Sequence, residues 1–178
     1  MSKKFLIIFV LIIFILIFVV IKLLATKNDT KIINNFDECV SEGYLVLESY
    51  PEKCVAPNGT FVRDIGNEME KIDLIKLEYP RPGVSISSPL QIKGEARGYW
   101  YFEANFPVRL FDSDGNEISV AIAEAKNDWM TTDFVPFEAT MYFDVPNTEK
   151  GKIVFEKSNP SDLPENSDFL EIPIIFSK

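Results

Sequence analysis

The feature that most constrains this chain is an uninterrupted run of Phe, Leu, Ile and Val over residues 5–21. A helix that is apolar on every side is buried in a large core or spans a membrane. With residues 22–25 the run is about 20 residues long, which as a helix matches the hydrocarbon thickness of about 30 Å. Lys22 can extend its side chain to the interface. We therefore predict that residues 1–26 form a single-pass transmembrane signal anchor.

A cleaved signal peptide is the alternative for this segment. Such a peptide has an apolar core of about 7–15 residues followed by a pair of small residues at the cleavage site. The run here is longer, and no pair with that spacing follows it. Lys3 and Lys4 favour a cytoplasmic amino terminus, but Lys22, Lys27 and Lys31 on the other flank oppose them. The charge pattern alone therefore leaves the orientation open.

The composition excludes several classes of function. The chain has a net charge of −9, and residues 1–26 contain three lysines and no acid, so residues 27–178 carry −12. An acidic surface repels nucleic-acid phosphates, so nucleic acid is not expected as a partner. Histidine is absent, which removes the commonest general base and zinc ligand. We expect no enzymatic activity and no cofactor. The alternative is an envelope enzyme that acts on glycans through paired carboxylates, which would need two acids about 5–10 Å apart across a cleft.

Two cysteines follow a short polar stalk at residues 27–33. Cys39 and Cys54 are the only cysteines, and we predict that they pair and staple a small region at residues 34–64. A bridge closing a loop of about 15 residues contributes about 3 kcal/mol in the loop-entropy model. Two free thiols in a cytosolic protein are the alternative. The staple requires an oxidising compartment, so it favours an extracytoplasmic location for the region after the anchor.

The stapled region contains a predicted helix and a predicted hairpin. Asn35 precedes Glu38 by three residues, which is typical of a helix start, so a helix is expected over residues 36–42 with Gly43 ending it. Asn58 and Gly59 between apolar residues predict a hairpin turn. Asn58 and Asn28 also each begin a glycosylation sequon. For Asn58 and Gly59 we prefer the hairpin turn as the interpretation.

Residues 51–61 have a distant similarity to the loop of Kazal-type protease inhibitors, in the order of cysteine, turn glycine and aromatic residue. That family needs three disulfides, whereas this chain can form one. A protease-inhibitor-like role of the stapled region is therefore carried as an alternative function.

After a predicted linker at residues 65–71, the pattern becomes that of an all-β domain at residues 72–178. Short runs rich in Val, Ile, Phe and Tyr alternate with turn residues such as Asp114, Gly115 and Asn116. The spacing predicts an immunoglobulin-like antiparallel β-sandwich of about seven strands. We expect them at residues 72–79, 89–95, 103–111, 117–124, 137–144, 152–157 and 169–176.

Residues 72–176 resemble the immunoglobulin-like domain of bacterial spore germination, a module of exported bacterial proteins. The resemblance rests on short motifs in one order: Pro80-Arg81-Pro82-Gly83, Ser88-Pro89-Leu90, Gly94-Glu95-Ala96-Arg97, Phe102 to Val108, Asp114-Gly115-Asn116, Asp128-Trp129-Met130-Thr131, Phe134-Val135-Pro136-Phe137, Lys157-Ser158-Asn159-Pro160 and Glu171-Ile172-Pro173. The resemblance implies a sandwich fold, an extracytoplasmic location and use as an interaction module. It supplies no catalytic residues.

Aromatic and apolar residues provide the candidate binding surface. Residues 99–102 are all aromatic, and strand alternation predicts either Trp100 and Phe102 or Tyr99 and Tyr101 on the solvent side. Residues 129–137 form an apolar connection expected to fold over the sandwich. The predicted surface comprises Tyr99, Trp100, Tyr101, Trp129, Met130 and Phe134.

Oxygen-rich residues 112–117 are a weaker candidate, for calcium. Asp112, Asp114 and Asn116 supply donors, but the glycine stands at the fourth position of the segment and not at the sixth, as an EF-hand requires. A hairpin turn is the preferred interpretation, and no metal is expected.

Together these patterns predict a non-catalytic binding or scaffolding module. We expect it in the bacterial cell membrane, single-pass, with its carboxy-terminal domain extracytoplasmic and an envelope protein or glycan as ligand.

Overall fold

The structure, a computed structural model, describes residues 12–18 and 31–177. Residues 12–18 are helical, with exposed apolar side chains. Within these two ranges no helix is both long and apolar enough to cross a membrane. Most of the predicted anchor at residues 1–26 and of the stalk at residues 27–33 lies outside the described residues. The chain separates into a smaller compact unit, up to Val46 and over Cys54–Phe61, and a larger one, over Leu47–Lys53 and from Val62 onward.

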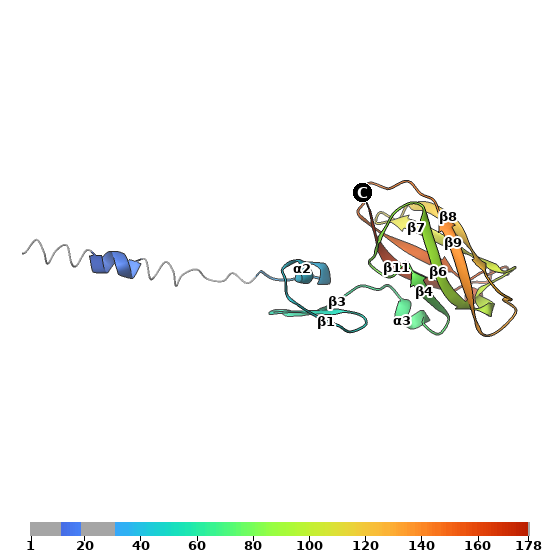
Figure 1. The fold of residues 1–178 in the computed structure, drawn as a ribbon, viewed down its shortest axis with the longest axis horizontal. Coiled ribbons are helices and arrows are strands. Elements are labelled where there is room, and N and C mark those ends of the chain that lie inside the picture. Colours follow the sequence, from blue (N-terminus) through green and yellow to red (C-terminus); the bar gives the residue numbers. More distant parts are fainter. Residues whose placement is uncertain (1–11, 19–30, 178) are drawn as a thin grey trace, which may run out of the picture. The chain divides into compact units, whose positions relative to one another are not determined.

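One short helix packs on a small sheet (Figure 1), and the two together are here called the smaller unit, although the strand ends Leu47, Lys53 and Val62 are grouped with the larger one. Helix α2 (Phe36–Ser41) begins as predicted, because the Asn35 side chain accepts a hydrogen bond from the Glu38 backbone N–H. Gly43 follows the helix with a φ of 77°, a left-handed conformation that glycine adopts without strain. Strands β1 (Leu45–Leu47), β2 (Lys53–Ala56) and β3 (Gly59–Val62) form the sheet in that order.

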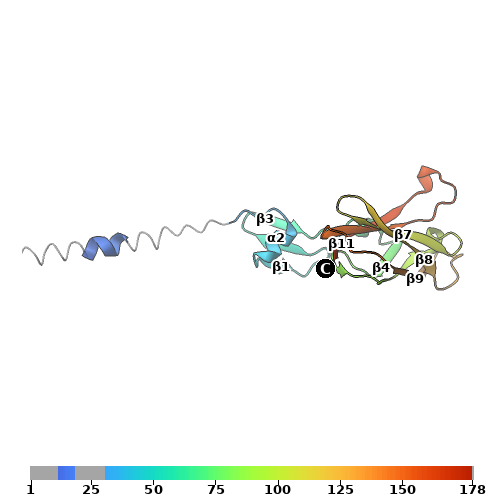
Figure 2. The same ribbon diagram turned by 90° about the horizontal axis from the view of Figure 1, so that it is seen from above.

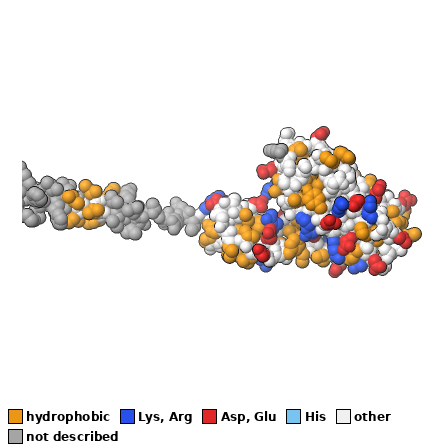
Figure 3. Space-filling model, in the orientation of Figure 1, with side chains coloured by type: hydrophobic (Ala, Val, Ile, Leu, Met, Phe, Trp, Pro, Cys, Tyr) orange, Lys and Arg blue, Asp and Glu red, His pale blue; other side chains and the backbone are white. Residues whose placement is uncertain are grey.

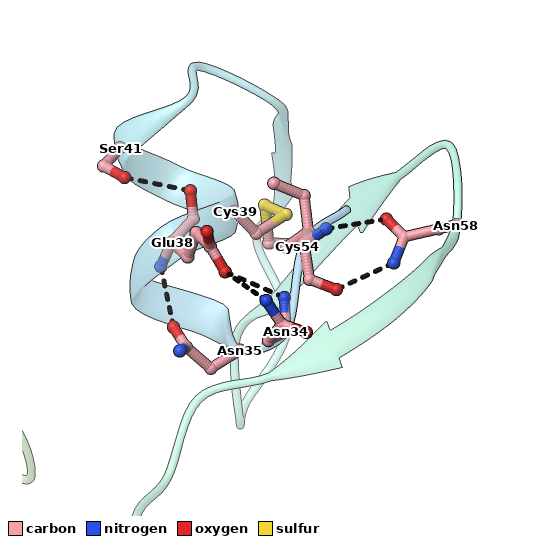
Figure 4. Close-up of a disulfide and its surroundings, with 8 residues drawn as sticks. Asn34, Asn35, Glu38, Cys39, Ser41, Cys54 and Asn58 are labelled. Atoms are coloured by element: carbon pink, nitrogen blue, oxygen red, sulfur yellow. Dashed lines mark hydrogen bonds between the residues drawn. A yellow bond between two sulfur atoms is a disulfide. The ribbon is translucent and has the colours of Figure 1, made fainter. Parts of the chain in front are cut away.

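A disulfide forms the centre of this unit (Figure 4). Cys39 of α2 and Cys54 of β2 are bonded, as predicted, and both are fully buried. Ile33, Phe36 and Ala56 complete a small buried cluster. Ile33, the last residue of the predicted stalk, is thus a core residue, and the Asn58 side chain holds it by bonding both its N–H and its C=O.

The hairpin between β2 and β3 is confirmed, but the position of its turn differs from the prediction. Pro57 and Asn58 form the turn, and Gly59 is already the first residue of β3. Proline fits the first central position of a turn because its ring fixes φ near −65°. The inhibitor-like segment is therefore largely a hairpin, with Cys54 and Ala56 buried in it.

The larger unit is a curled eight-stranded sheet in the described residues, in the order β4-β6-β9-β8-β7-β10-β11-β5. Its strands are β4 (Ile75–Tyr79), β5 (Ser85–Ile86), β6 (Leu90–Arg97), β7 (Asn105–Asp112), β8 (Glu117–Ala125), β9 (Phe134–Met141), β10 (Lys150–Glu156) and β11 (Phe169–Phe176). The seven predicted strands are present, and all but the last, at residues 169–176, have shifted ends. The sheet is mixed and not purely antiparallel, because the additional strand β5 pairs in parallel with β11.

Strand β8 connects the two layers of a sandwich-like fold. It pairs with β7 along most of its length and with β9 only at Glu124 and Ala125. The strands on either side of it therefore face each other across one core (Figures 1 and 2). Phe137 of β9 packs against Phe106 of β7 at 4.9 Å between ring centroids, and against Phe155 of β10 at 6.3 Å. These ring contacts join the two layers.

Two predicted connections contain regular structure. In residues 65–71, Ile65 and Glu68 are buried and helix α3 (Glu68–Lys71) forms, so this segment is not an extended linker. The Asn67 side chain bonds the backbone of Phe169 and Glu171 and covers the edge of β11. Residues 134–137, predicted as part of an apolar loop, begin β9, because they pair with residues 94–97 of β6.

Candidate functional site

Three connections of the larger unit meet at one end of its strands, here called the loop end: residues 98–104, 126–133 and 157–168. The β7–β8 register places Asn105, at the start of β7, opposite Glu124, near the end of β8. The Ser158 N–H bonds the Trp100 carbonyl at 3.0 Å, and the Gly98 N–H bonds the Asp133 carbonyl at 3.1 Å. The loop end is therefore one connected surface.

The aromatic run in residues 99–102 does not follow strand alternation. A 3₁₀ turn, η1 (Gly98–Trp100), replaces the extended chain and points two consecutive rings inward. Trp100 and Tyr101 are buried, whereas Tyr99 and Phe102 are about half exposed. Both alternatives predicted from alternation are thus wrong. Trp100 and Tyr101 belong to the core, although both were predicted as surface residues.

Tyr101 is fixed in this core by its hydroxyl and its ring. The hydroxyl donates to the Val135 carbonyl at 2.6 Å, and the ring packs edge-on against Phe106 at 5.2 Å. Burial raises the pKa of the Tyr101 hydroxyl well above its ordinary value, so the phenol stays protonated. Its contribution is to hold η1 against β9.

The connection at residues 126–133 lies directly on η1. A Cβ added to Gly98 would lie 2.0 Å from the Thr131 carbonyl oxygen and 2.3 Å from that of Trp129, so only glycine fits there. Trp129 is partly buried against the core, while Met130, next to it, is 77% exposed. The loop folds back as predicted and presents Met130 to solvent.

Phe134, the last member of the predicted surface, lies between two cations. The Lys76 ammonium is 3.8 Å and the Arg97 guanidinium 4.0 Å from the centre of its ring. Arg97 also donates to the carbonyls of Asp73 and Thr132. Phe134 is partly buried, and its ring face is used by these contacts.

A tight turn with an uncommon backbone carries Phe102. Phe102 and Asn105 bond each other through both backbone groups, and between them Glu103 and Ala104 have φ values of 52° and 64°. Two positive φ values are the hallmark of a type I′ turn, in which Asn and Gly are favoured. Residues with a Cβ are strained at positive φ. Backbone strain of this kind is often found at binding sites.

The long connection at residues 157–168 is held by its own polar side chains and projects beyond the strands (Figure 2). Asn159 donates to the Leu163 carbonyl and to the Ser167 hydroxyl, and it accepts from Ser161. A 3₁₀ turn, η2 (Pro164–Asn166), lies near its tip. The loop therefore has a defined shape and can form a wall of a site.

A cleft of about 600 Å³ lies under this loop, here called the loop-end cleft. Phe102 and Phe169 line it, with exposed fractions of 44% and 48%, together with Pro107 and polar residues of the loop. A smaller cleft of about 330 Å³ shares Phe169 and Glu156 with it and continues along the outer side of β10 and β11. On the face of the molecule in Figure 3, hydrophobic side chains are likewise interspersed with charged ones.

Two carboxylates that line the cleft beside the aromatic rings, those of Glu156 and Asp168, form ion pairs with neighbouring cations. Glu156 lies 2.9 Å from Arg109, which also contacts Glu117 at 2.8 Å, and these hydrogen bonds raise the pKa of Arg109. Asp168 lies 2.6 Å from Lys71. A glycosidase acid needs a raised carboxyl pKa. Among the described residues burial gives that property to Glu68, which pairs with Arg81 and does not line the cleft.

The oxygen-rich segment at residues 112–117 is a hairpin turn. The Asp112 carboxylate accepts hydrogen bonds from the backbone N–H groups of Asp114 and Asn116 and from the Asn116 side chain. The Asn116 side-chain bond, followed by the backbone bonds, lowers the pKa of Asp112. Within residues 12–18 and 31–177, no group of three acidic or cysteine side chains is placed to hold a metal ion.

Comparison with known proteins supports the predicted immunoglobulin-like fold. Residues 74–163, just over half of the chain, match the family model of the immunoglobulin-like domain of bacterial spore germination. This match lies within residues 72–176, the range that resembles the same family. No curated protein and no solved structure matches the chain.

Proposed function

Because the chain belongs to the family of immunoglobulin-like domains of bacterial spore germination, we propose that it is a binding or scaffolding module without catalytic activity. In this proposal residues 1–26 anchor it in the membrane, and the larger unit binds an envelope protein or glycan outside the cytoplasm. The family membership favours a role in binding. Immunoglobulin-like folds carry out many functions, so the ligand must be argued from the site.

Two features support the location. The apolar run at residues 5–21 has the composition of a membrane-spanning helix. The bond between Cys39 and Cys54 is stable in an oxidising compartment, whereas the cytosol keeps most thiols reduced. An anchor followed by a disulfide-bonded region is consistent with export of residues 27–178.

The observation that carries the binding proposal is the pair of half-exposed rings, Phe102 and Phe169, in the loop-end cleft. Exposed aromatic side chains lose water contact favourably on binding and are enriched at protein contacts. The strained turn at Glu103 and Ala104 holds one ring, and β11 holds the other, so little ordering is needed when a ligand binds.

Binding to envelope material tests this proposal. Full-length protein carrying Phe102→Ser and Phe169→Ser should bind isolated cell envelopes of the source bacterium several-fold more weakly than the unmodified protein. The matched control is Val120→Ser with Ile122→Ser, which removes two exposed apolar side chains of β8 that do not line the cleft. Equal binding by both double variants and the unmodified protein would refute a role for the cleft.

The location is tested separately with a reporter enzyme that is active only outside the cytoplasm, fused after Lys178. Activity is expected, together with a Cys39–Cys54 bond in non-reducing mass spectrometry of the exported chain. A silent reporter on a stably expressed fusion would contradict export.

A further inference from the structure

The small sheet β1–β3 has one covered and one open face. Side chains alternate between the faces of a strand. Val46, Cys54, Ala56 and Phe61 belong to or pack against the cluster that α2 covers. The alternate positions form the other face, here called the open face: Leu45, Leu47, Lys53, Val55, Thr60 and Val62.

The open face is mostly apolar. Leu45 is 65% exposed, and Leu47, Val55 and Val62 are all exposed as well. Four aliphatic side chains on six positions are unusual for a solvent-facing sheet, where polar residues normally alternate with buried ones. A clustered apolar patch of this kind generally contacts a partner or a membrane.

Charge is distributed in the opposite way on the two sides of the smaller unit. Asp37, Glu38 and Glu42 lie in or directly after α2, on the side of the sheet that the helix covers. Lys31 on that side pairs with Glu38 at 3.1 Å and with Glu42 at 2.8 Å, so the four charges sum to −2. The one charged residue of the open face is Lys53. The helix side is therefore charged, with a net negative charge, and the sheet side is apolar with one cation. An apolar face opposite a charged one is the division found in structures that lie in a membrane interface.

We propose that the open face lies against the lipid surface of the membrane in which the chain is anchored. This inference rests on the proposed anchor at residues 1–26. The Lys53 ammonium can reach lipid phosphates, the aliphatic side chains can enter the interface, and the acids on α2 remain on the side away from the phosphates.

The short connection favours lipid over other occupants. Ile33 is buried in the smaller unit, so residues 26–32 are the whole connection to the apolar run. Even fully extended, seven residues span at most about 25 Å. That is less than the diameter of a small domain, about 30 Å, so a second protein does not fit readily between the open face and the bilayer. Lipid, in contrast, is always within reach at high effective concentration.

Site-specific photocrosslinking tests this contact. The full chain is reconstituted in vesicles, with a benzophenone amino acid at Leu45 or at Val55, and at Ser41 of α2 as the matched exposed control. Vesicles of phosphatidylcholine alone and of phosphatidylethanolamine with phosphatidylglycerol are compared. Lipid adducts at positions 45 and 55 should exceed those at position 41 several-fold, because in the proposed orientation the open face enters the interface and α2 lies on the side away from it. Apolar contact predicts adducts in both kinds of vesicle.

Other outcomes would overturn the inference. Covalent dimers without lipid adducts would assign the face to a second copy of the chain, and equal labelling at all three positions would show no preferred side. If the chain fails to float with the vesicles, the anchor and this inference both fail. If it floats but positions 45 and 55 yield no lipid adduct, the inference alone fails.

A charge substitution gives an independent readout. In the Leu45→Glu, Val55→Glu double variant, a benzophenone amino acid at Thr60, on the same face, should lose most of its lipid adducts. The Cys39–Cys54 bond, checked by non-reducing mass spectrometry, reports whether the unit still folds. Undiminished adducts in a variant with this bond intact would contradict the proposed orientation.

Discussion

Replacing Ala104 by glycine should stabilise the protein, against the usual effect of such a change. Ala104 has a φ of 64° in the turn that carries Phe102. The left-handed region costs a residue with a Cβ about 1–2 kcal/mol, which glycine does not incur. Glycine also increases the entropy of the unfolded chain, which lowers the free energy of unfolding by about 0.4–1 kcal/mol. The net expectation is a gain of about 1 kcal/mol in the free energy of unfolding.

The assay is equilibrium unfolding of the full chain in detergent, followed by the fluorescence of buried Trp100. A gain of about 1 kcal/mol corresponds to a rise in Tm of about 2–4 °C for a protein of this size. Ala121→Gly is the control, because Ala121 lies buried in β8 and a glycine within a strand costs about 0.5–1 kcal/mol. Destabilisation by both substitutions would refute the strain argument.

Three further predictions concern other parts of the fold. Replacing Cys39 and Cys54 by serine should destabilise the smaller unit by about 3 kcal/mol, since the bridge closes a loop of 15 residues. Backbone hydrogen exchange should then become faster in α2 and β2, and an unchanged exchange rate would contradict this prediction. Gly98→Ala should lower stability by about 1–3 kcal/mol in thermal unfolding, because its Cβ would meet the Thr131 carbonyl; an unchanged Tm would show that the loop yields freely. The folded-state pKa of Asp112 is lowered, so its stabilisation is present above the ordinary carboxyl pKa of about 3.9 and is lost as pH falls through the folded value. Asp112→Ala should therefore lower Tm at neutral pH by an amount that shrinks on acidification below about pH 4, and a pH-independent difference would argue against the carboxylate as the cause.

Local patterns predicted the elements of this protein well. The spacing of apolar runs predicted a strand at residues 169–176, and β11 spans Phe169–Phe176. Asn35 and Gly43 marked the ends of α2, because caps and left-handed glycines act within a few residues. The cysteine pairing followed from there being two cysteines.

The loop-end cleft could not be read from the sequence in the same way. Phe102 was considered as one ring of an aromatic run, and Phe169 as the start of a strand; their common cleft depends on how β7, β10 and β11 pair. A signal for Phe169 existed in its position at the strand end beside a polar loop, but many strand ends share it.

The amino-acid order by itself determined where strands, caps and the disulfide occur, because these depend on neighbours within a few residues or on a unique pair of cysteines. Tertiary structure decided which aromatic rings are core. Trp100 and Tyr101 are consecutive, and both are buried because η1 bends the chain and residues 126–133, Val135 and Ser158 close around it. Burial of a side chain depends on what packs over it, and here those residues come from distant parts of the chain.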